Sequence, residues 1–407
     1  MARHRAPGTT ASKRRVASWP IAVLVTVVLV AVAWVGWAWV GNEASKRAAA
    51  AASGCPGGLT TIQVATDPSI ADIIGAETVR YQDGKPVVGD TCVKIKVTSI
   101  NSAAALYALE HGWDTAKLGP KPQAWIPDSS LWTTQLTTAE PAIAGDTTQS
   151  IASSPVVLAM STDAGKVMQS SGSVPWSQLP GLVGQDNGWA TLGQPLWGRF
   201  TLALPDPANN AASMLALISM LDPATAQGQQ AITPAMLGAP AVTQGLNSFA
   251  DTQPNPVPTT VKEALTTLGR AAGVQSAPYT AVATTELQLY QRNLGKDGSA
   301  PAANVLDEVR PSSTTASVDF PFLPLAGDWV TADQVAVAQH FRDFLLTPPE
   351  QNQLTLSGLR TGTGTHYPNS SPGMDWGLVA RASTPTDVNS YRQMVTAWTT
   401  AAAQSQH

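Results

Sequence analysis

The sequence is poor in charge, histidine and cysteine, and each shortage excludes a class of function. Only 13% of the 407 residues are charged, five are histidines and two are cysteines. No two histidines have the i, i+4 spacing of a helical metal pair, and the glycine-serine elbow, the phosphate-binding loop and the dinucleotide fingerprint are absent. We therefore expect no catalytic site, no metal site and no cofactor.

Basic residues are also scarce outside the N-terminal segment. Without the five in the first fifteen residues, 19 Lys and Arg face 28 Asp and Glu. An acidic surface repels phosphates, so residues 41–407 should bind neither nucleic acid nor an anionic lipid surface. With 43% apolar residues the chain can still bury a core, and its length suits one two-lobed domain or two smaller ones.

One hydrophobic run near the N-terminus is long enough to cross a membrane. Residues 21–40 carry no charge, and twenty residues at about 1.5 Å each span the roughly 30 Å hydrocarbon layer. We expect a basic cytoplasmic tail over 1–18, a transmembrane helix over 19–40 and a linker over 41–58, with the remaining chain outside. A cleaved secretory signal is the alternative, because Ala48–Ala52 could offer a cleavage site.

The two cysteines, Cys55 and Cys92, lie before one expected strand and at the start of another. In an oxidising compartment outside the cell, an isolated pair most simply forms one disulfide. Two buried free thiols are the alternative.

Strands and helices alternate along the chain. A short polar turn and a helical pattern follow most strands, which indicates an α/β fold with βαβ units on a largely parallel sheet. The expected strands cover 59–66, 92–100, 122–127, 154–161, 199–205, the start of 279–293, and 318–327.

Helix boundaries are best marked in the C-terminal third. Thr331 and Gln334 form a capping box, and Thr347 and Glu350 form a second one with Pro348 at the first helical position. A long apolar helix is expected over 211–221, and a last amphipathic helix over about 386–403.

Four strands end in Ser, Thr or Asn where a helix begins. Ligands of open α/β sheets bind at this edge, where helix N-termini present free N–H groups. Hydroxyl and amide groups there suit a small polar or anionic ligand. Each residue taken alone could equally be an ordinary helix N-cap. The pairs are Thr66 and Ser69, Asn101 and Ser102, Ser129 and Ser130, and Thr284 and Thr285.

Seven motifs in order carry a resemblance to a known family. They are VATDPSIADII (64–74), AWIPDSSLW (124–132), SSPVVLAM (153–160), FTLALPDPANNAAS (200–213), VATTELQLYQRN (282–293), VDFPFLPLAGDWV (318–330) and FRDFLLTPPEQNQLTLSGLR (341–360). The chain resembles the extracellular solute-binding proteins of the two-lobed type 2 periplasmic-binding-protein fold, in the branch that includes molybdate-type binders. It is similar to actinobacterial members that are often fused to a von Willebrand factor A domain. Asp146–Ser150 resembles the metal motif of that domain by chance, since no buried strand precedes it.

The resemblance implies a ligand cleft between two lobes. We expect the first lobe over 59–150, the second over 151–280, and a return to the first lobe with C-terminal helices over 281–407. Ser69 and Ser102 match the two serines that hold an oxyanion in the molybdate-type pattern. The stretch Asp206–Asn210, with Asp206 and Asn209, matches the loop of the second lobe.

Two carboxylates at strand ends, Asp128 and Glu286, depart from that pattern. A carboxylate beside a bound anion is costly unless it is protonated or paired. They would favour a ligand with an amine, a hydroxyl-rich ligand or a metal, and their alternative role is that of first-turn acids in helices.

The sequence thus predicts a single-pass protein of the cell membrane whose extracytoplasmic domain captures a small molecule or oxyanion in an interlobe cleft. A transporter or another envelope protein would be its partner. The alternative is a cell-envelope scaffold that keeps the fold without ligand transport. The candidate ligand-binding residues are Thr66, Ser69, Asn101, Ser102, Asp128, Ser129, Ser130, Asp206, Asn209, Thr285 and Glu286.

Overall fold

The computed structural model describes most of the chain after the N-terminal segment. The expected cytoplasmic tail, the transmembrane helix over 19–40 and most of the linker lie outside the described residues. In the part that is described, none of the helices combines the length and the apolar character that a membrane crossing needs. The described residues are 55, 57–145, 148–172, 174–221, 234–300, 303–312, 315–366, 370–377 and 388–405.

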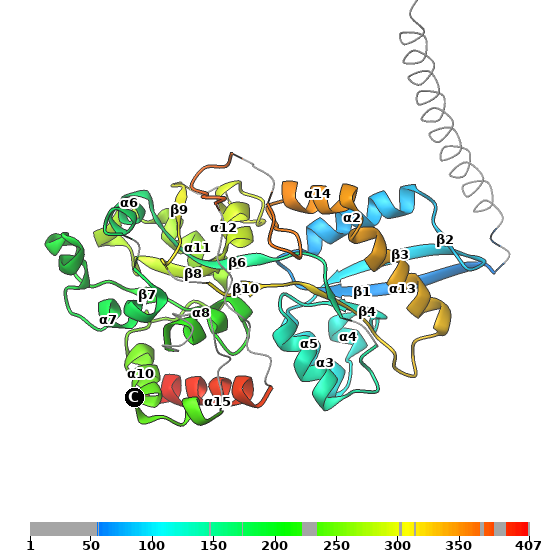
Figure 1. The fold of residues 1–407 in the computed structure, drawn as a ribbon, viewed down its shortest axis with the longest axis horizontal. Coiled ribbons are helices and arrows are strands. Elements are labelled where there is room, and N and C mark those ends of the chain that lie inside the picture. The colour runs from blue at the N-terminus through cyan, green and yellow to red at the C-terminus, as the bar shows by residue number, and fades with distance from the viewer. Residues whose placement is uncertain are drawn as a thin grey trace, which may run out of the picture.

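The fold has two lobes, each built on its own sheet (Figure 1). The first sheet has a parallel centre, in which β1 pairs with β3 on one side and with β4 on the other. Helices follow these strands, as the alternating pattern predicts. The strand order is β2 (Val87–Val88), β3 (Thr91–Ser99), β1 (Leu59–Thr66), β4 (Ala124–Ile126), β11 (Pro321–Pro324) and β5 (Gln149–Ser150). The helices after β1, β3 and β4 include α2 (Ala71–Asp83), α3 (Ser102–His111) and α5 (Ser130–Ala139).

The second sheet is mixed and centres on the almost fully buried strand β6. Its pairs with β8, β9 and β10 are antiparallel, whereas β7 and β8 are parallel. The strands are β10 (Ser317–Val318), β6 (Ser154–Ser161), β8 (Ala281–Thr285), β7 (Leu202–Ala203) and β9 (Leu306–Val309). Around them lie α6 (Thr162–Ser170), α8 (Ala211–Leu221), α11 (Val261–Arg270) and α12 (Glu286–Asn293).

The expected return to the first lobe at residue 281 is wrong. Strands β8, β9 and β10 all belong to the second sheet, which therefore extends to Val318, and the chain rejoins the first sheet at β11. A strand-and-helix pattern does not reveal which sheet a strand joins, because the pairing partners of β8, β9 and β10 lie far away in the sequence.

The C-terminal helices are divided between the lobes. Helix α13 (Ala332–Leu345) packs on β1 and β11, and α14 (Pro348–Leu356) follows it on the same lobe. The last helix, α15 (Val388–Gln404), lies along α10 (Pro240–Asp251) and α9 (Pro234–Leu237) of the second lobe and also reaches α5 of the first (Figure 1). In that contact the rings of Trp132 and Tyr391 meet edge to face, with centroids 5.6 Å apart.

One of the two predicted capping boxes is confirmed. Thr331 and Gln334 cap α13 reciprocally, with hydrogen bonds of 3.3 and 3.0 Å. The second box is wrong, although α14 does begin at Pro348. The Thr347 hydroxyl donates to the carbonyl of Phe344 instead, and Glu350 pairs with Arg80 of α2 at 3.0 Å.

The predicted disulfide between Cys55 and Cys92 is confirmed, with Cα atoms 5.5 Å apart. It joins the segment before β1 to the second residue of β3, next to the parallel ladder in which Leu59 pairs with Cys92. The bridge therefore ties the start of the described domain to the centre of its first sheet.

Removing the bridge should destabilise the domain. The cysteines are 37 residues apart, so a Cys55→Ser, Cys92→Ser double variant should lose roughly 2–4 kcal/mol through the greater entropy of its unfolded chain. Urea unfolding, followed by circular dichroism, measures the loss. Equal midpoints for wild type and variant under oxidising conditions would contradict a structural role.

Candidate functional site

A cavity of about 430 Å³ lies between the lobes. The first lobe contributes the loops that follow β1, β3 and β4. The second contributes the N-terminal parts of α8 and α11, residues along α12 and the turn that follows α12. Backbone N–H groups and positive dipole ends therefore meet at this cleft. The polar side chains on its wall are Asp67, Ser69, Asp72, Ser99, Asn101 and Asp128 from the first lobe, and Asn209, Asn210, Thr259, Thr260, Lys262, Gln288, Gln291, Lys296 and Asp297 from the second.

The two serines expected to hold an oxyanion bind a carboxylate of the protein itself. Asp67 directly follows β1, and its Oδ1 accepts hydrogen bonds from the Ser69 hydroxyl at 2.7 Å and the Ser69 backbone N–H at 2.9 Å. Its Oδ2 accepts from the Ser102 hydroxyl at 2.7 Å. Asp67 is only 7% exposed, so these three donors stabilise a nearly buried charge.

Asp128 lies next to this carboxylate. Its backbone N–H donates to the Ser102 hydroxyl oxygen at 3.0 Å, and its Oδ1 accepts from the Trp132 indole at 2.6 Å. Burial, with the negative charge of Asp67, raises the pKa of Asp128 from 3.8 to about 8, against the lowering effect of Trp132, Ser102 and the backbone of Ala211. Asp128 is therefore mostly protonated at neutral pH. The Ala211 contact joins it to the start of α8 in the other lobe.

Two further hydrogen bonds cross the cleft. The Asn101 side-chain amide donates to the carbonyl of Asn209 at 3.3 Å, and the Gln291 amide donates to the carbonyl of Ser69 at 2.9 Å. Asn101 also caps α3 by accepting from the N–H of Ala104. The cleft edges are thus held together by side chains that would separate if the lobes opened.

The structure brings only part of the predicted set into this cleft. Ser69, Asn101, Asp128 and Asn209 line it, and Ser102 stands behind Asp67. Thr66, Ser129 and Thr285 are buried, and the last two cap helices. Ser130 lines a separate cavity with Asp319, to which its backbone N–H donates at 2.7 Å.

Glu286 is fully buried and forms an ion pair with Arg360, close to the segments through which the chain passes between the lobes. Arg360 donates to both of its carboxylate oxygens, at 2.7 and 2.9 Å. The backbone of Arg360 exchanges two 2.8 Å hydrogen bonds with Ser153, which precedes β6. The pair thus joins α12 to the segments that connect the lobes, away from the ligand cavity.

A second carboxylate completes this buried network. Glu308 accepts from Arg310 at 2.5 Å, and Arg310 lies 3.7 Å from Glu286. Burial and the charge of Glu286 raise the pKa of Glu308 to about 8. The sequence signal for Glu286, an acid at a strand end, could not reveal these partners, because they come from distant segments.

Sequence reasoning missed several cleft residues. Asp67 is not among the residues predicted from the sequence, although it lies directly after a strand, which is the signal that selected Asp128. Lys262, Gln291 and Lys296 come from helices α11 and α12 and the turn after α12. Their positions depend on how the lobes pack, so the sequence carried no signal for them.

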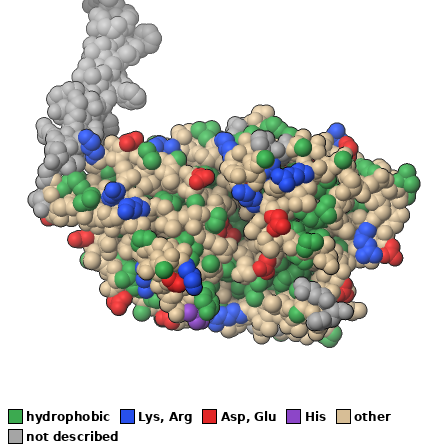
Figure 2. Space-filling view, turned by 180° about the vertical axis from the view of Figure 1, so that it is seen from behind, with side chains coloured by type: hydrophobic (Ala, Val, Ile, Leu, Met, Phe, Trp, Pro, Cys, Tyr) green, Lys and Arg blue, Asp and Glu red, His purple; other side chains and the backbone are tan. Residues whose placement is uncertain are grey.

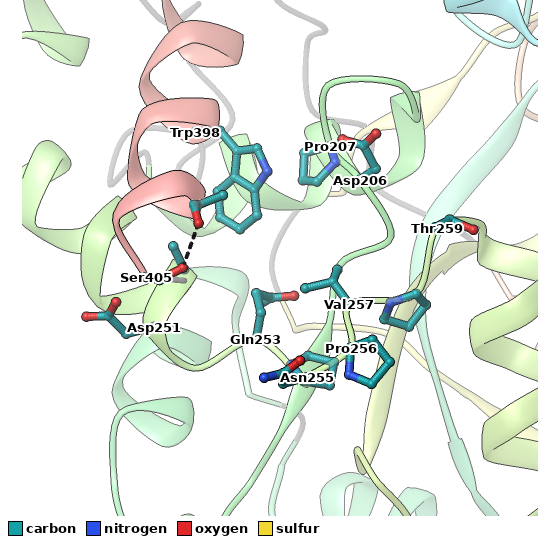
Figure 3. Close-up of a pocket in the computed structure, with 14 residues that line it drawn as sticks. Asp206, Pro207, Asp251, Gln253, Asn255, Pro256, Val257, Thr259, Trp398 and Ser405 are labelled. Atoms are coloured by element: carbon teal, nitrogen blue, oxygen red, sulfur yellow. Dashed lines mark hydrogen bonds between the residues drawn. The ribbon is translucent and has the colours of Figure 1, made fainter. Parts of the chain in front are cut away.

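A larger cavity of about 810 Å³, which shares Thr259 with the first, lies between the second lobe and α15 (Figure 3). Asp206 lines this space with Pro207, Val257 and Trp398. Its carboxylate accepts a hydrogen bond from the Asn209 side-chain amide at 2.5 Å, so Asp206 supports a residue of the interlobe cavity without lining that cavity. Among the residues that the structure describes, the wall of the larger cavity contains none from the first lobe. The smaller cavity is therefore the one whose wall both lobes share.

The raised pKa of Asp128 predicts a measurable effect of pH on stability. A carboxyl group whose pKa is higher in the folded than in the unfolded chain destabilises the fold as pH rises between the two values, here about 4 to 8. Asp128→Asn should therefore lose less thermal stability than wild type between about pH 5 and pH 8.

Exposed Asp114, whose pKa is lowered by Lys117, supplies the control. Asp114→Asn should keep the wild-type slope across this range, because the carboxyl of Asp114 titrates below it. If the melting temperatures of wild type and Asp128→Asn changed equally with pH, the Asp128 carboxyl would already be ionised at low pH.

Comparisons with known proteins agree with this architecture. The family described as "Bacterial extracellular solute-binding protein" matches residues 62–360. An uncharacterized protein of Mycobacterium tuberculosis, found in strains H37Rv and CDC 1551, is 32% identical over 364 residues, which is 88% of this chain and 52% of the relative. The chain thus spans about half the length of the curated relatives it matches.

Solved structures show the same two-lobed periplasmic-binding-protein fold at low identity. The ferric binding protein from Campylobacter jejuni has a TM-score of 0.54 and 11% identity over 84% of this chain and 99% of its own. Iron-bound HitA from Pseudomonas aeruginosa has 0.53 and 15%, over 84% and 99%. AfuA from Actinobacillus pleuropneumoniae, with fructose-6-phosphate bound, has 0.53 and 10%, over 85% and 99%.

Proposed function

Because the chain belongs to the bacterial extracellular solute-binding protein family, we propose that it captures a small polar ligand between its two lobes while residues 19–40 hold it in the membrane. The observation that carries the first part is the interlobe cavity. Its walls come from strand-end loops of one lobe and from the N-terminal parts of α8 and α11, helix α12 and the turn after α12 in the other. The family and fold support binding rather than catalysis, and we propose no enzymatic step.

Hinge closure follows from the contacts across the cleft. The bonds from Asn101 to Asn209 and from Gln291 to Ser69 join the lobes at the cavity edge. A ligand that adds contacts to both walls would stabilise this arrangement relative to an open one. Ser69, Asn101, Asp128 and Asn209 are the residues of the original set that we propose for ligand contact.

The buried pair of Glu286 and Arg360 supports a defined hinge. Breaking a buried ion pair leaves an unpaired charge and costs about 3–5 kcal/mol, so this connection stays formed while the lobes move. Its position beside Ser153, at a lobe crossing, keeps that segment fixed.

Membrane attachment is supported by the uncharged run and the basic tail of the sequence. A permanent tether would keep the domain at the membrane surface, where a transporter or another envelope protein could receive the ligand. A scaffold without ligand is the competing function, and the occupation of Ser69 and Ser102 by Asp67 favours it if the cleft proves unable to bind.

Ligand capture is tested by thermal shift of the full chain in detergent. Amino acids, sugars, oxyanions and divalent metals are the probes, and one class should stabilise the protein by about 2.7 kcal/mol when present at a hundredfold excess over its Kd. Asn101→Ala and Gln291→Ala should weaken that stabilisation, because each removes a contact between the lobes.

Asn187→Ala is the matched control, since Asn187 donates to Pro195 in an exposed loop of the second lobe. It should respond to the ligand as wild type does. Stabilisation by no class of probe would favour the scaffold.

Anchoring is tested by fractionation of cells that express the full chain or a variant without residues 1–54. The full chain should stay with the membranes after an alkaline wash, because the uncharged run spans the hydrocarbon layer. The shortened variant should be soluble. A soluble full-length product with a new N-terminus near Ala48–Ala52 would instead establish cleavage.

A further inference from the structure

We propose that the interlobe cleft selects a small zwitterion, with its ammonium group on the carboxylates of the first lobe and its acidic group on the lysines of the second. This inference rests on the proposed function and names the ligand class of the same site. The charged groups of the two walls carry it.

The first-lobe wall is acidic. The carboxylates of Asp67 and Asp72 line it beside the mostly protonated Asp128, and it contributes no lysine or arginine to the described cavity. Asp67 already accepts the Ser69 and Ser102 hydroxyls, so its carboxylate stands where an oxyanion would otherwise bind. A carboxylate has about four acceptor positions, and three are used, which leaves room for one ammonium donor. An anion on this wall would meet a buried like charge at high cost.

The second-lobe wall is basic once its internal pairs are considered. It contributes Lys262, Lys296 and Asp297. The buried Arg292 binds both oxygens of Asp297, at 3.1 and 3.0 Å, and so neutralises that acid within the wall. Across the described part of the chain, neither lysine has a carboxylate as an ion-pair partner. Two positive charges therefore remain for a ligand.

Lys262 is placed at a local electrostatic cost. It is the second residue of α11, where the positive end of the helix dipole opposes a cation. An acidic ligand group bound there would contact both the lysine and the first N–H groups of the helix. An anion bound by both Lys262 and the N-terminus of α11 would offset this electrostatic cost.

The cleft differs from the general surface because its acids lie on the first-lobe wall and its lysines lie on the second-lobe wall. On the face seen in Figure 2, acidic and basic side chains are dispersed among neutral atoms. In the cleft, a sugar would leave both sets of charges desolvated, and an oxyanion or a diamine would satisfy one wall only. The uncharged amides of Asn101, Gln288 and Gln291 line the space between the two walls, and those of Asn101 and Gln291 also join the lobes. A cavity of about 430 Å³ suits a molecule of amino-acid size.

The test is isothermal titration calorimetry on the full chain in detergent with five probes: L-alanine, γ-aminobutyrate, 1,4-diaminobutane, sulfate and glucose. At least one of the two zwitterions should bind saturably, and more tightly than the other three. Asp67→Asn should weaken that binding about tenfold or more by removing the charge, as should the Lys262→Gln, Lys296→Gln double variant. Lys166→Gln, on α6 and outside the cavity, should bind as wild type does.

A gain of binding tests the role of Asp67 separately. Asp67→Ala frees the Ser69 and Ser102 hydroxyls and the Ser69 N–H, so this variant should bind sulfate at concentrations at which wild type does not. Circular dichroism confirms its fold, and Asp67→Asn, which keeps an oxygen acceptor for the serines, should gain less.

The outcomes separate this inference from the proposed function. Tighter binding of diamine, sulfate or glucose by wild type overturns the zwitterion while capture stands. The same conclusion follows if wild type binds none of the five but Asp67→Ala binds sulfate, because the cleft is then competent. If neither protein binds any probe, both the zwitterion and capture in this cleft are overturned.

Discussion

The buried carboxylate of Asp67 is the constraint on which the binding wall of the first lobe depends. A nearly buried charge must be hydrogen-bonded, and its three donors come from the loops after β1 and β3. Ser102 also accepts from the backbone of Asp128, after β4, so three strand ends form one polar cluster. Burial, together with the charge of Asp67, raises the pKa of Asp128 to about 8 and keeps it mostly protonated at neutral pH. Asp67 therefore influences both the arrangement of the loops on this wall and the charge that the wall carries.

A second acid, Glu286, has the opposite role although the sequence presents it in the same way. It follows β8 as Asp128 follows β4, but Arg360 covers it completely and ties it to the lobe crossing. A buried ion pair contributes little net stability, yet its loss is costly. Such a pair is suited to fixing a pivot. At the cleft, by contrast, single amide hydrogen bonds join the lobes.

Local elements were predictable because short-range patterns determine them. Strand β1, strand β6 and helix α8 begin and end at the predicted residues, since alternating or continuous apolar residues mark buried elements. The box at Thr331 was confirmed for the same reason. The box at Thr347 failed because Glu350 found a better partner in Arg80, which lies 270 residues away. The lobe boundary failed because strand pairing is a long-range choice.

The amino-acid sequence alone determined the α/β class, the disulfide, the edge of the first sheet where polar groups gather, and the resemblance to extracellular solute-binding proteins. All of these depend on residue types and their spacing over short distances. Only the tertiary structure decided that Ser69 and Ser102 hold Asp67, that Glu286 pairs with Arg360, and that Lys262 and Lys296 share a cavity with the acids of the other lobe. Those outcomes depend on which distant groups are buried together, since burial decides whether a carboxylate is paired, protonated or free to meet a ligand.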